Sequence, residues 1–257
     1  MITLLALLLS APLGAEEAFV PVVEDLPNGG RIDWTSLRLE VSAGSDITIG
    51  AWKDRRVQEQ DALDRLSPAI AKLAARVCVT PGSTAGDLMD GSSELATRLQ
   101  EALHSWKIDE TRYHSKGSVE LDAALDLQAW LRPALTSLAT STVPPLPADA
   151  ATGLVIDTRG LPFEPCLAPT VLQPDGTAIM RAQLLGEEAA NLSTPVAYVS
   201  DPADPRVWKR VGDRPYLARA ATVHSHELVL DPATAAGLPP ETAALVARGK
   251  VVMVVEP

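Results

Sequence analysis

Three side chains in the second half of the chain have the chemistry that acid–base catalysis needs. Asp157 and Glu164 are carboxyl groups close together in the sequence, and paired carboxyls can serve hydrolysis as general acid and general base. His226 adds an imidazole that titrates near neutral pH. Asp157, however, lies two residues before Arg159, so on a strand the two side chains can hydrogen-bond to each other. A hydrolase that uses Asp157, Glu164 and His226 is therefore the alternative hypothesis, and a structural role for Asp157 is preferred.

A metal site is the second chemistry to consider, because His224 and His226 are two residues apart. A strand would place both imidazoles on one face, while Glu227 would point away and no third ligand is adjacent. The sequence holds no CxxC, HExxH or GxSxG motif, and Gly153 and Gly160 are not followed by the capped helix of a phosphate-binding loop. We therefore predict a non-enzymatic protein with no catalytic residues, no metal and no cofactor.

The chain has two cysteines, Cys78 and Cys166, one in each half. In an oxidising compartment they are a candidate disulfide that would join the two halves. Both have apolar neighbours, and free cysteine is among the residue types most often buried. Because the sequence does not place their Cα atoms within bonding distance, a disulfide and two buried thiols stay open as alternatives.

Residues 1–15 have the features of a secretory signal peptide. Their apolar core is followed by Pro12 and Gly14, and Ala15 is a small residue at the cleavage position. No Lys or Arg precedes the core, so a buried N-terminal helix is the alternative. No later segment has the roughly 20 apolar residues that a spanning helix needs. We expect an exported, periplasmic protein with no direct membrane span.

The charge balance excludes one class of partner. The chain has 33 acidic and 22 basic residues, a net charge of −11. Nucleic-acid binding requires clustered Lys and Arg to neutralise phosphates, so we predict no nucleic-acid partner.

Apolar periodicity predicts the elements of the first half. Three- and four-residue steps predict a helix from residue 53 to 77, continuous but kinked at Pro68. Strict alternation predicts a hairpin over 107–127 with one wet face. Alternation also runs through 32–41 but changes phase near 35–36, which we interpret as one strand with a β-bulge.

In the second half, the apolar run from Leu154 to Ile156 indicates a strand. Residues 207–215 are predicted as a strand and turn, and 238–247 as a helix. The final strand, 250–255, contains the run VVMVV, which indicates burial on both faces.

These elements predict an α+β fold of two small modules, each a mainly antiparallel sheet packed on helices. A length of 257 residues suits one or two domains, and three prolines near residue 145 favour a semi-rigid linker between them. The predicted division is a signal peptide at 1–15, an extended lead-in at 16–30, an N-terminal α+β domain at 31–139, a Pro-rich linker at 140–151 and a C-terminal α+β domain at 152–257.

The segment GLVIDTRG, residues 153–160, followed by Leu161, resembles a signature of exported bacterial proteins of the Lpp-twenty surface-lipoprotein type. The stretches GRIDWT at 30–35 and RVGDRP at 210–215 are similar to further segments of that family. Two departures are Thr158, where the signature has alanine, and the lack of a cysteine for lipid attachment after the apolar N-terminal run.

The resemblance implies an envelope-associated, non-enzymatic protein, related to flagellar outer-membrane assembly proteins. It transfers no catalytic residues and implies a structural motif that opens the second domain, made of Gly153, Asp157, Arg159, Gly160 and Leu161. We expect partners among envelope or flagellar proteins, with a homo-oligomer as an open alternative. An edge strand within 107–127 could pair with a neighbouring subunit. An envelope hydrolase and a small-ligand or metal-binding module are the alternative functions.

Overall fold

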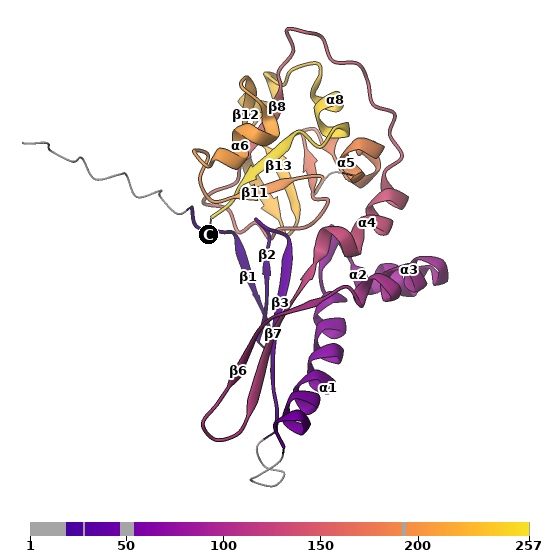
Figure 1. The fold of residues 1–257 in the computed structure, drawn as a ribbon. Coiled ribbons are helices and arrows are strands. Elements are labelled where there is room, and N and C mark those ends of the chain that lie inside the picture. Colours follow the sequence, from indigo (N-terminus) through magenta and orange to yellow (C-terminus); the bar gives the residue numbers. More distant parts are fainter. Residues whose placement is uncertain (1–18, 28, 47–53, 192–193, 257) are drawn as a thin grey trace, which may run out of the picture.

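The computed structural model describes residues 19–27, 29–46, 54–191 and 194–256. The predicted signal peptide at 1–15 lies outside these residues. Two sheets lie one above the other in Figure 1, the first from the N-terminal half and the second from the C-terminal half. Residues 140–151, the predicted linker, hold neither helix nor strand.

The N-terminal sheet is antiparallel throughout, as predicted. It has the order β1-β2-β3-β7-β6, and β1 falls within the predicted extended lead-in. The strands of this sheet are β1 (Val23–Leu26), β2 (Gly30–Asp33), β3 (Arg38–Gly44), β6 (Lys107–Tyr113) and β7 (Val119–Asp126). The predicted hairpin over 107–127 is therefore confirmed as β6 and β7.

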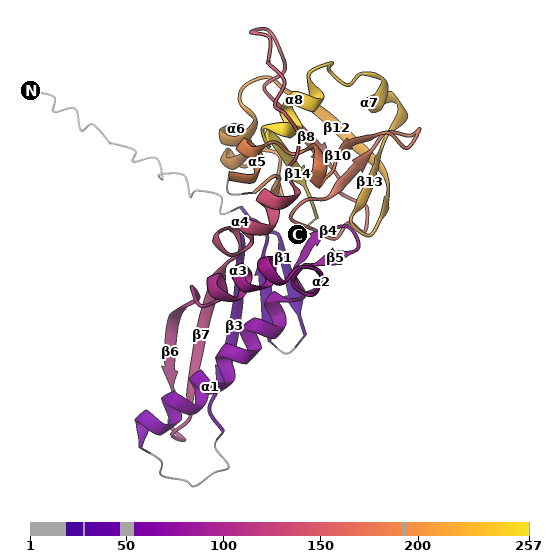
Figure 2. The same cartoon turned by 90° about the vertical axis from the view of Figure 1, so that its right-hand side faces the viewer.

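One face of this sheet is covered by helix α1 (Arg55–Ala74), which crosses it in Figure 2. The predicted helix is confirmed as one continuous element that includes Pro68. Its apolar stripe is buried at Ala62, Leu66, Ile70 and Leu73 against β3 and β7. Side chains alternate between the two faces of a strand, so the other face of β7 presents polar residues to solvent.

The single bulged strand predicted for residues 32–41 is wrong. Residues 34–37 are a tight turn between β2 and β3. The carboxylate of Asp33 accepts hydrogen bonds from the backbone N–H groups of Thr35 (2.8 Å) and Ser36 (3.0 Å), and Leu37 adopts a positive φ of 58°. The chain reverses here, which changes the phase of the alternation just as a bulge would.

A small hairpin and three helices lie where the two halves meet (Figure 2). Asp126 caps α4 by accepting a hydrogen bond from the N–H of Ala129 (3.0 Å), which ends β7 and starts the helix at once. The elements are β4 (Cys78–Thr80), β5 (Ser83–Thr84), α2 (Ala85–Gly91), α3 (Ser93–Leu103) and α4 (Leu127–Leu138).

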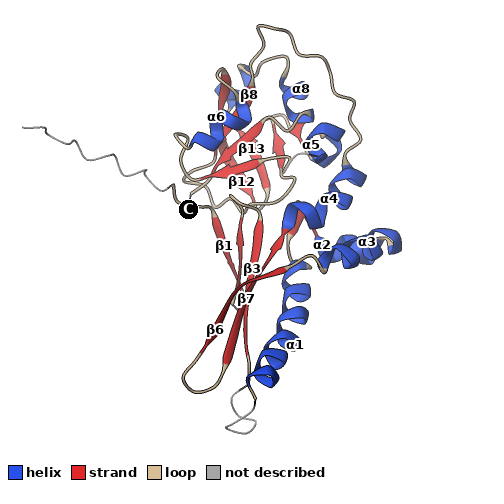
Figure 3. Cartoon of the chain, in the orientation of Figure 1, coloured by secondary structure: helices blue, strands red, loops and turns tan. Residues whose placement is uncertain are grey.

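The C-terminal sheet has seven strands in the order β10-β9-β13-β12-β8-β14-β11. Its strands are β8 (Gly153–Asp157), β9 (Thr170–Leu172), β10 (Ala178–Met180), β11 (Ala197–Val199), β12 (Pro215–His224), β13 (Glu227–Leu230) and β14 (Val251–Val254). Its helices are η1 (Ala182–Leu184), α5 (Glu187–Asn191), α6 (Pro205–Val211), α7 (Pro232–Ala236) and α8 (Thr242–Ala247), drawn blue around the red strands in Figure 3.

The prediction of an α+β fold with sheets packed on helices is confirmed, but the C-terminal sheet is mixed instead of mainly antiparallel. Four neighbouring pairs are parallel, β8 with β12, β8 with β14, β14 with β11, and β13 with β9. Two are antiparallel, β12 with β13 and β9 with β10. Central parallel strands are covered on both faces and have continuous apolar runs, as β14 does.

Helices α6 and α8 cover opposite faces of β8. Val155 packs with Val207 and Val211 of α6, whereas Leu154 belongs to the other core together with Val246 of α8. The strand predicted for 207–215 is therefore wrong over its first part. Asp204 caps α6 by accepting from the N–H of Arg206 (2.8 Å), and Pro205 occupies its first turn, a position where proline favours helix.

The two sheets share one continuous hydrophobic core. Trp34 from the turn after β2 makes an edge-to-face contact with Tyr198 of β11, with ring centroids 5.9 Å apart. The backbone N–H groups of Leu167 and Ala168 donate to the carbonyls of Cys78 (3.1 Å) and Val79 (2.9 Å) of β4. The two halves are therefore joined by packing and by backbone pairing. Within the described part of the chain, no helix combines the length and the apolarity needed to cross a membrane.

Candidate functional site

The segment after β8 is held by a pair of side chains within it. Arg159 donates to the Asp157 carboxylate through Nε (2.9 Å), Nη2 (2.8 Å) and the backbone N–H (3.1 Å). These hydrogen bonds from Arg159 lower the pKa of Asp157 against the opposing effect of partial burial. The carboxylate therefore braces the turn, as the preferred structural interpretation expects.

Neighbouring residues of the same motif fix the path of the chain. Both the backbone N–H and Oγ1 of Thr158 donate to the carbonyl of Val254, each at 2.9 Å. Gly160 has a positive φ of 79°, which glycine adopts without steric cost, and its N–H donates to the Glu256 carboxylate (3.1 Å). Leu161 is partly buried against the core.

The Asp157–Arg159 pair makes the free energy of unfolding depend on pH in the acid range. Because the folded state lowers the pKa of Asp157 below its ordinary 3.8, the contribution is present above about pH 4 and is lost as pH falls through the folded-state value. The pair is about one-third to one-half exposed, so we expect only about 0.5–1 kcal/mol. A double-mutant cycle of Asp157→Asn and Arg159→Gln, followed by urea unfolding, should show this coupling at pH 7 and a smaller coupling as the pH is lowered into the acid range. A coupling that does not change with pH would contradict the assignment.

The structure places two of the three residues in the hydrolase hypothesis, Glu164 and His226, in contact with each other. His226 Nδ1 lies 2.8 Å from the backbone carbonyl of Glu164, and its Nε2 lies 3.6 Å from Glu164 Oε2. Asp157 instead gives both carboxylate oxygens to Arg159. These contacts therefore do not bring Asp157, Glu164 and His226 together at one site.

His226 lies beside both cysteines. The two sulfurs and one ring nitrogen of His226 all lie within 4.8 Å of one another. Cys78 is the first residue of β4, Cys166 lies in the loop between β8 and β9, and His226 lies in the turn between β12 and β13. Both cysteines are free thiols, Cys166 fully buried and Cys78 partly buried. The structure thus brings the candidate disulfide pair together and adds His226, and the bond itself stays a prediction.

We define Cys78, Cys166 and His226 as the thiol–imidazole cluster. The pKa values of its three groups are shifted in different directions. Hydrogen bonds from Cys166 and His226 lower the pKa of Cys78 to about 6 against the opposing effect of burial. The hydrogen bond with Cys78 raises the pKa of His226 to about 9. Burial raises the pKa of Cys166. Near neutral pH, Cys78 therefore carries a thiolate next to an imidazolium.

The sequence spacing could not have revealed this cluster, because its members come from three distant segments. The His224 and His226 pair was the nearest signal, but His224 is exposed at the end of β12 and only His226 turns towards the thiols. The expectation of no metal site rested on ligands adjacent in the sequence, whereas the members of this cluster come from three separate segments.

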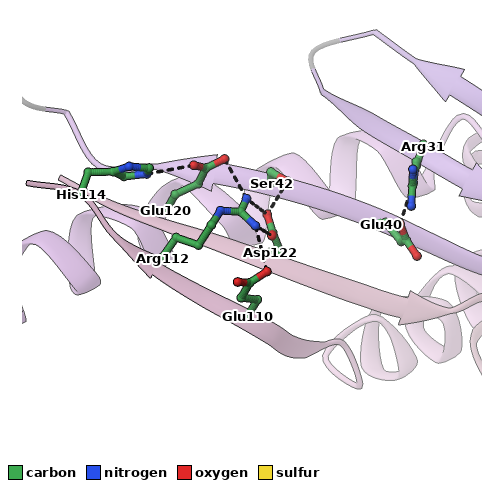
Figure 4. Close-up of polar contacts among 8 residues, drawn as sticks. All are labelled: Arg31, Glu40, Ser42, Glu110, Arg112, His114, Glu120 and Asp122. Atoms are coloured by element: carbon green, nitrogen blue, oxygen red, sulfur yellow. Dashed lines mark hydrogen bonds and ion pairs between the residues drawn. The ribbon is translucent and has the colours of Figure 1, made fainter.

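A second group of polar side chains lies on the open face of the N-terminal sheet (Figure 4). Arg112 of β6 donates to Glu120 (3.1 Å), to Asp122 (2.8 Å) and to Glu110 (3.0 Å). His114 Nε2 lies 3.1 Å from Glu120. These hydrogen bonds raise the pKa of Arg112 and lower that of Glu120. Three carboxylates surround one guanidinium in this group, which we call the Arg112 cluster. The cluster therefore gives its face of the sheet a net negative charge.

The strand beside this cluster is an open sheet edge. Among the residues that the structure describes, β6 pairs with β7 on one side only and is the last strand in the order of the sheet. It is exposed along much of its length, with Ile108 at 43% and Tyr113 at 48%. An edge strand offers unpaired backbone groups to another chain, and charged residues limit indiscriminate pairing.

The fold and these sites define a two-sheet α+β protein with an open sheet edge and a thiol–imidazole cluster at the junction of its halves. Residues 153–257 match a spirochaete protein family described as Treponema pallidum Tp0624, second domain. The match begins at β8 and spans the whole C-terminal sheet. No curated protein matches the chain. The match is to this domain family, so the resemblance to the Lpp-twenty type stays a prediction.

Proposed function

We propose that this chain is a non-enzymatic, exported periplasmic protein that works in the cell envelope by protein–protein contacts. The observation that carries the proposal is the open edge strand β6, which stands beside the negatively charged Arg112 cluster. A free edge can accept a strand from a partner, and the charged face next to it would select partners with basic groups.

More specifically, we propose that the chain is a relative of the Lpp-twenty surface proteins and of flagellar outer-membrane assembly proteins. It is supported by the GLVIDTRGL segment, whose residues hold the turn after β8, and by the apolar N-terminal run. In this proposal the protein associates with the outer membrane through its partners.

Site-specific photo-crosslinking tests the proposed edge. A photoreactive phenylalanine derivative at Ile108 of β6 should crosslink to a partner in the native envelope, because an added strand would lie within contact distance. The matched control is the same residue at Lys209, which is exposed on α6. Crosslinks of equal yield from both positions, or from neither, would contradict the proposal. The mass of the product separates a second copy of the chain from a different envelope protein.

The alternative of an envelope hydrolase is less well supported. It requires Asp157, Glu164 and His226 to act together, and the Asp157 carboxylate is hydrogen-bonded to Arg159.

A further inference from the structure

The thiol–imidazole cluster has a donor set that metal ions use. Two thiols and one imidazole converge with all three donor atoms within 4.8 Å of one another. A tetrahedral zinc with bonds of about 2.3 Å to sulfur and 2.0 Å to nitrogen spaces its ligand atoms at about 3.5–3.8 Å. The side chains therefore need to close by only about 1 Å, which rotamer adjustment can provide.

The surroundings of His226 orient it as a ligand. The carbonyl of Glu164 can only accept a hydrogen bond, so the ring nitrogen beside it, Nδ1, is the one that carries the proton (2.8 Å). A metal ion that displaces the second proton of the imidazolium would therefore bind at Nε2. Metal-binding histidines commonly donate their second N–H to a backbone carbonyl or carboxylate in this way.

Cys166 is held in place by a buried tyrosine. The hydroxyl of Tyr198 accepts from the N–H of Cys166 (3.2 Å) and donates to its carbonyl (2.5 Å). The next residue, Leu167, donates its N–H to the carbonyl of Cys78 (3.1 Å), so the backbones at the two thiols are fixed beside each other. A preorganised donor set costs less to assemble around an ion.

We propose that Cys78, Cys166 and His226 bind a single thiophilic d10 cation, Zn²⁺ or Cu⁺, at the junction of the two sheets. Thiolate ligands select these ions over Mg²⁺ and Ca²⁺. With three protein ligands, zinc would keep a fourth position for a water molecule or another ligand. A disulfide would use only the two sulfurs and would give the third donor no role. Because its ligands come from both halves of the chain, the ion would tie these two halves together.

Metal content and metal titration test the proposal. The full-length chain is isolated from its native envelope without chelators, and its metal is measured by inorganic mass spectrometry. The metal-free, reduced protein is then titrated anaerobically with Zn²⁺ and, separately, with Cu⁺, each against a chromogenic chelator. We expect one equivalent of one of these ions per chain, and the two arms show which. Cobalt substitution should add a thiolate-to-metal charge-transfer band.

Variants decide whether the ion occupies this cluster. His226→Ala, Cys78→Ser and Cys166→Ser should each lose the bound equivalent, and the two serine variants should also lose the cobalt band. If the variant at the fully buried Cys166 does not fold, His226→Ala, at a side chain that is 20% exposed, carries the test. His224→Ala is the matched control and should bind normally, since His224 is exposed.

Three results would overturn the proposal. The first is the absence of a stoichiometric ion in both titrations. The second is an ion that His226→Ala retains at full affinity. The third is a Cys78–Cys166 disulfide in the protein as isolated, detected by thiol alkylation, together with no bound metal.

Discussion

Replacing Trp34 with alanine should destabilise the protein by about 3–5 kcal/mol, because the side chain links the two sheets. The indole is 1% exposed and packs edge-to-face against Tyr198 of the C-terminal sheet. Its Nε1 donates to the Glu24 carboxylate at 2.9 Å. The substitution would leave a cavity in the shared core and would also remove a hydrogen-bond partner from Glu24.

Denaturant unfolding followed by circular dichroism measures this loss. Trp208→Ala is the matched control, because that side chain on α6 is 52% exposed, and we expect a change within about 0.5 kcal/mol. A single cooperative transition shifted to lower denaturant in the Trp34 variant would show that the two sheets unfold together. If the Trp34 and Trp208 variants were equally stable, the shared core would not contribute as described.

The second large effect is expected at Gly153, the first residue of β8. A Cβ at this position would lie 2.3 Å from Cβ and 2.6 Å from Cα of Val211, so helix α6 would have to move away from the sheet. Gly153→Ala should therefore cost about 1–3 kcal/mol, the range typical of overpacking. The same clash gives a physical reason for glycine at the start of the GLVIDTRGL segment.

Gly91→Ala is the control for Gly153, because a Cβ at Gly91 meets no atom within 4 Å and the residue does not have a positive φ. Its stability should be unchanged or slightly raised, since alanine restricts the unfolded chain. Thermal unfolding of both variants compares them directly. Equal stability of the Gly153 and Gly91 variants would contradict the clash with Val211.

Much of the N-terminal sheet was predictable from periodicity. The alternation in β7 and the three- and four-residue steps in α1 are local patterns, and burial on one face is enough to produce them. The turn at 34–37 was missed because a reversal of the chain and a bulge both shift the phase of an alternating pattern. The Asp33 side chain that caps this turn was the available signal.

The C-terminal sheet was harder to predict. Whether β8 and β14 pair in parallel depends on the connections between them, which apolar runs do not encode. Most of helix α6 fell within the strand predicted from residue 207. Val207 and Val211 are β-branched and favour strands, yet Asp204 and Pro205 form a helix start that outweighs this preference.

The sequence by itself determined the α+β class, the acidic surface and the bracing of Asp157 by Arg159, because each depends on composition or on residues that are near neighbours. Only the tertiary structure decided that Cys78, Cys166 and His226 meet, since three distant segments must cross at one point of the fold. It also decided that the carboxylates of β7 gather around Arg112 of β6, because strand register sets which side chains face one another. Local patterns specify elements, whereas sites that join elements are products of how the elements pack.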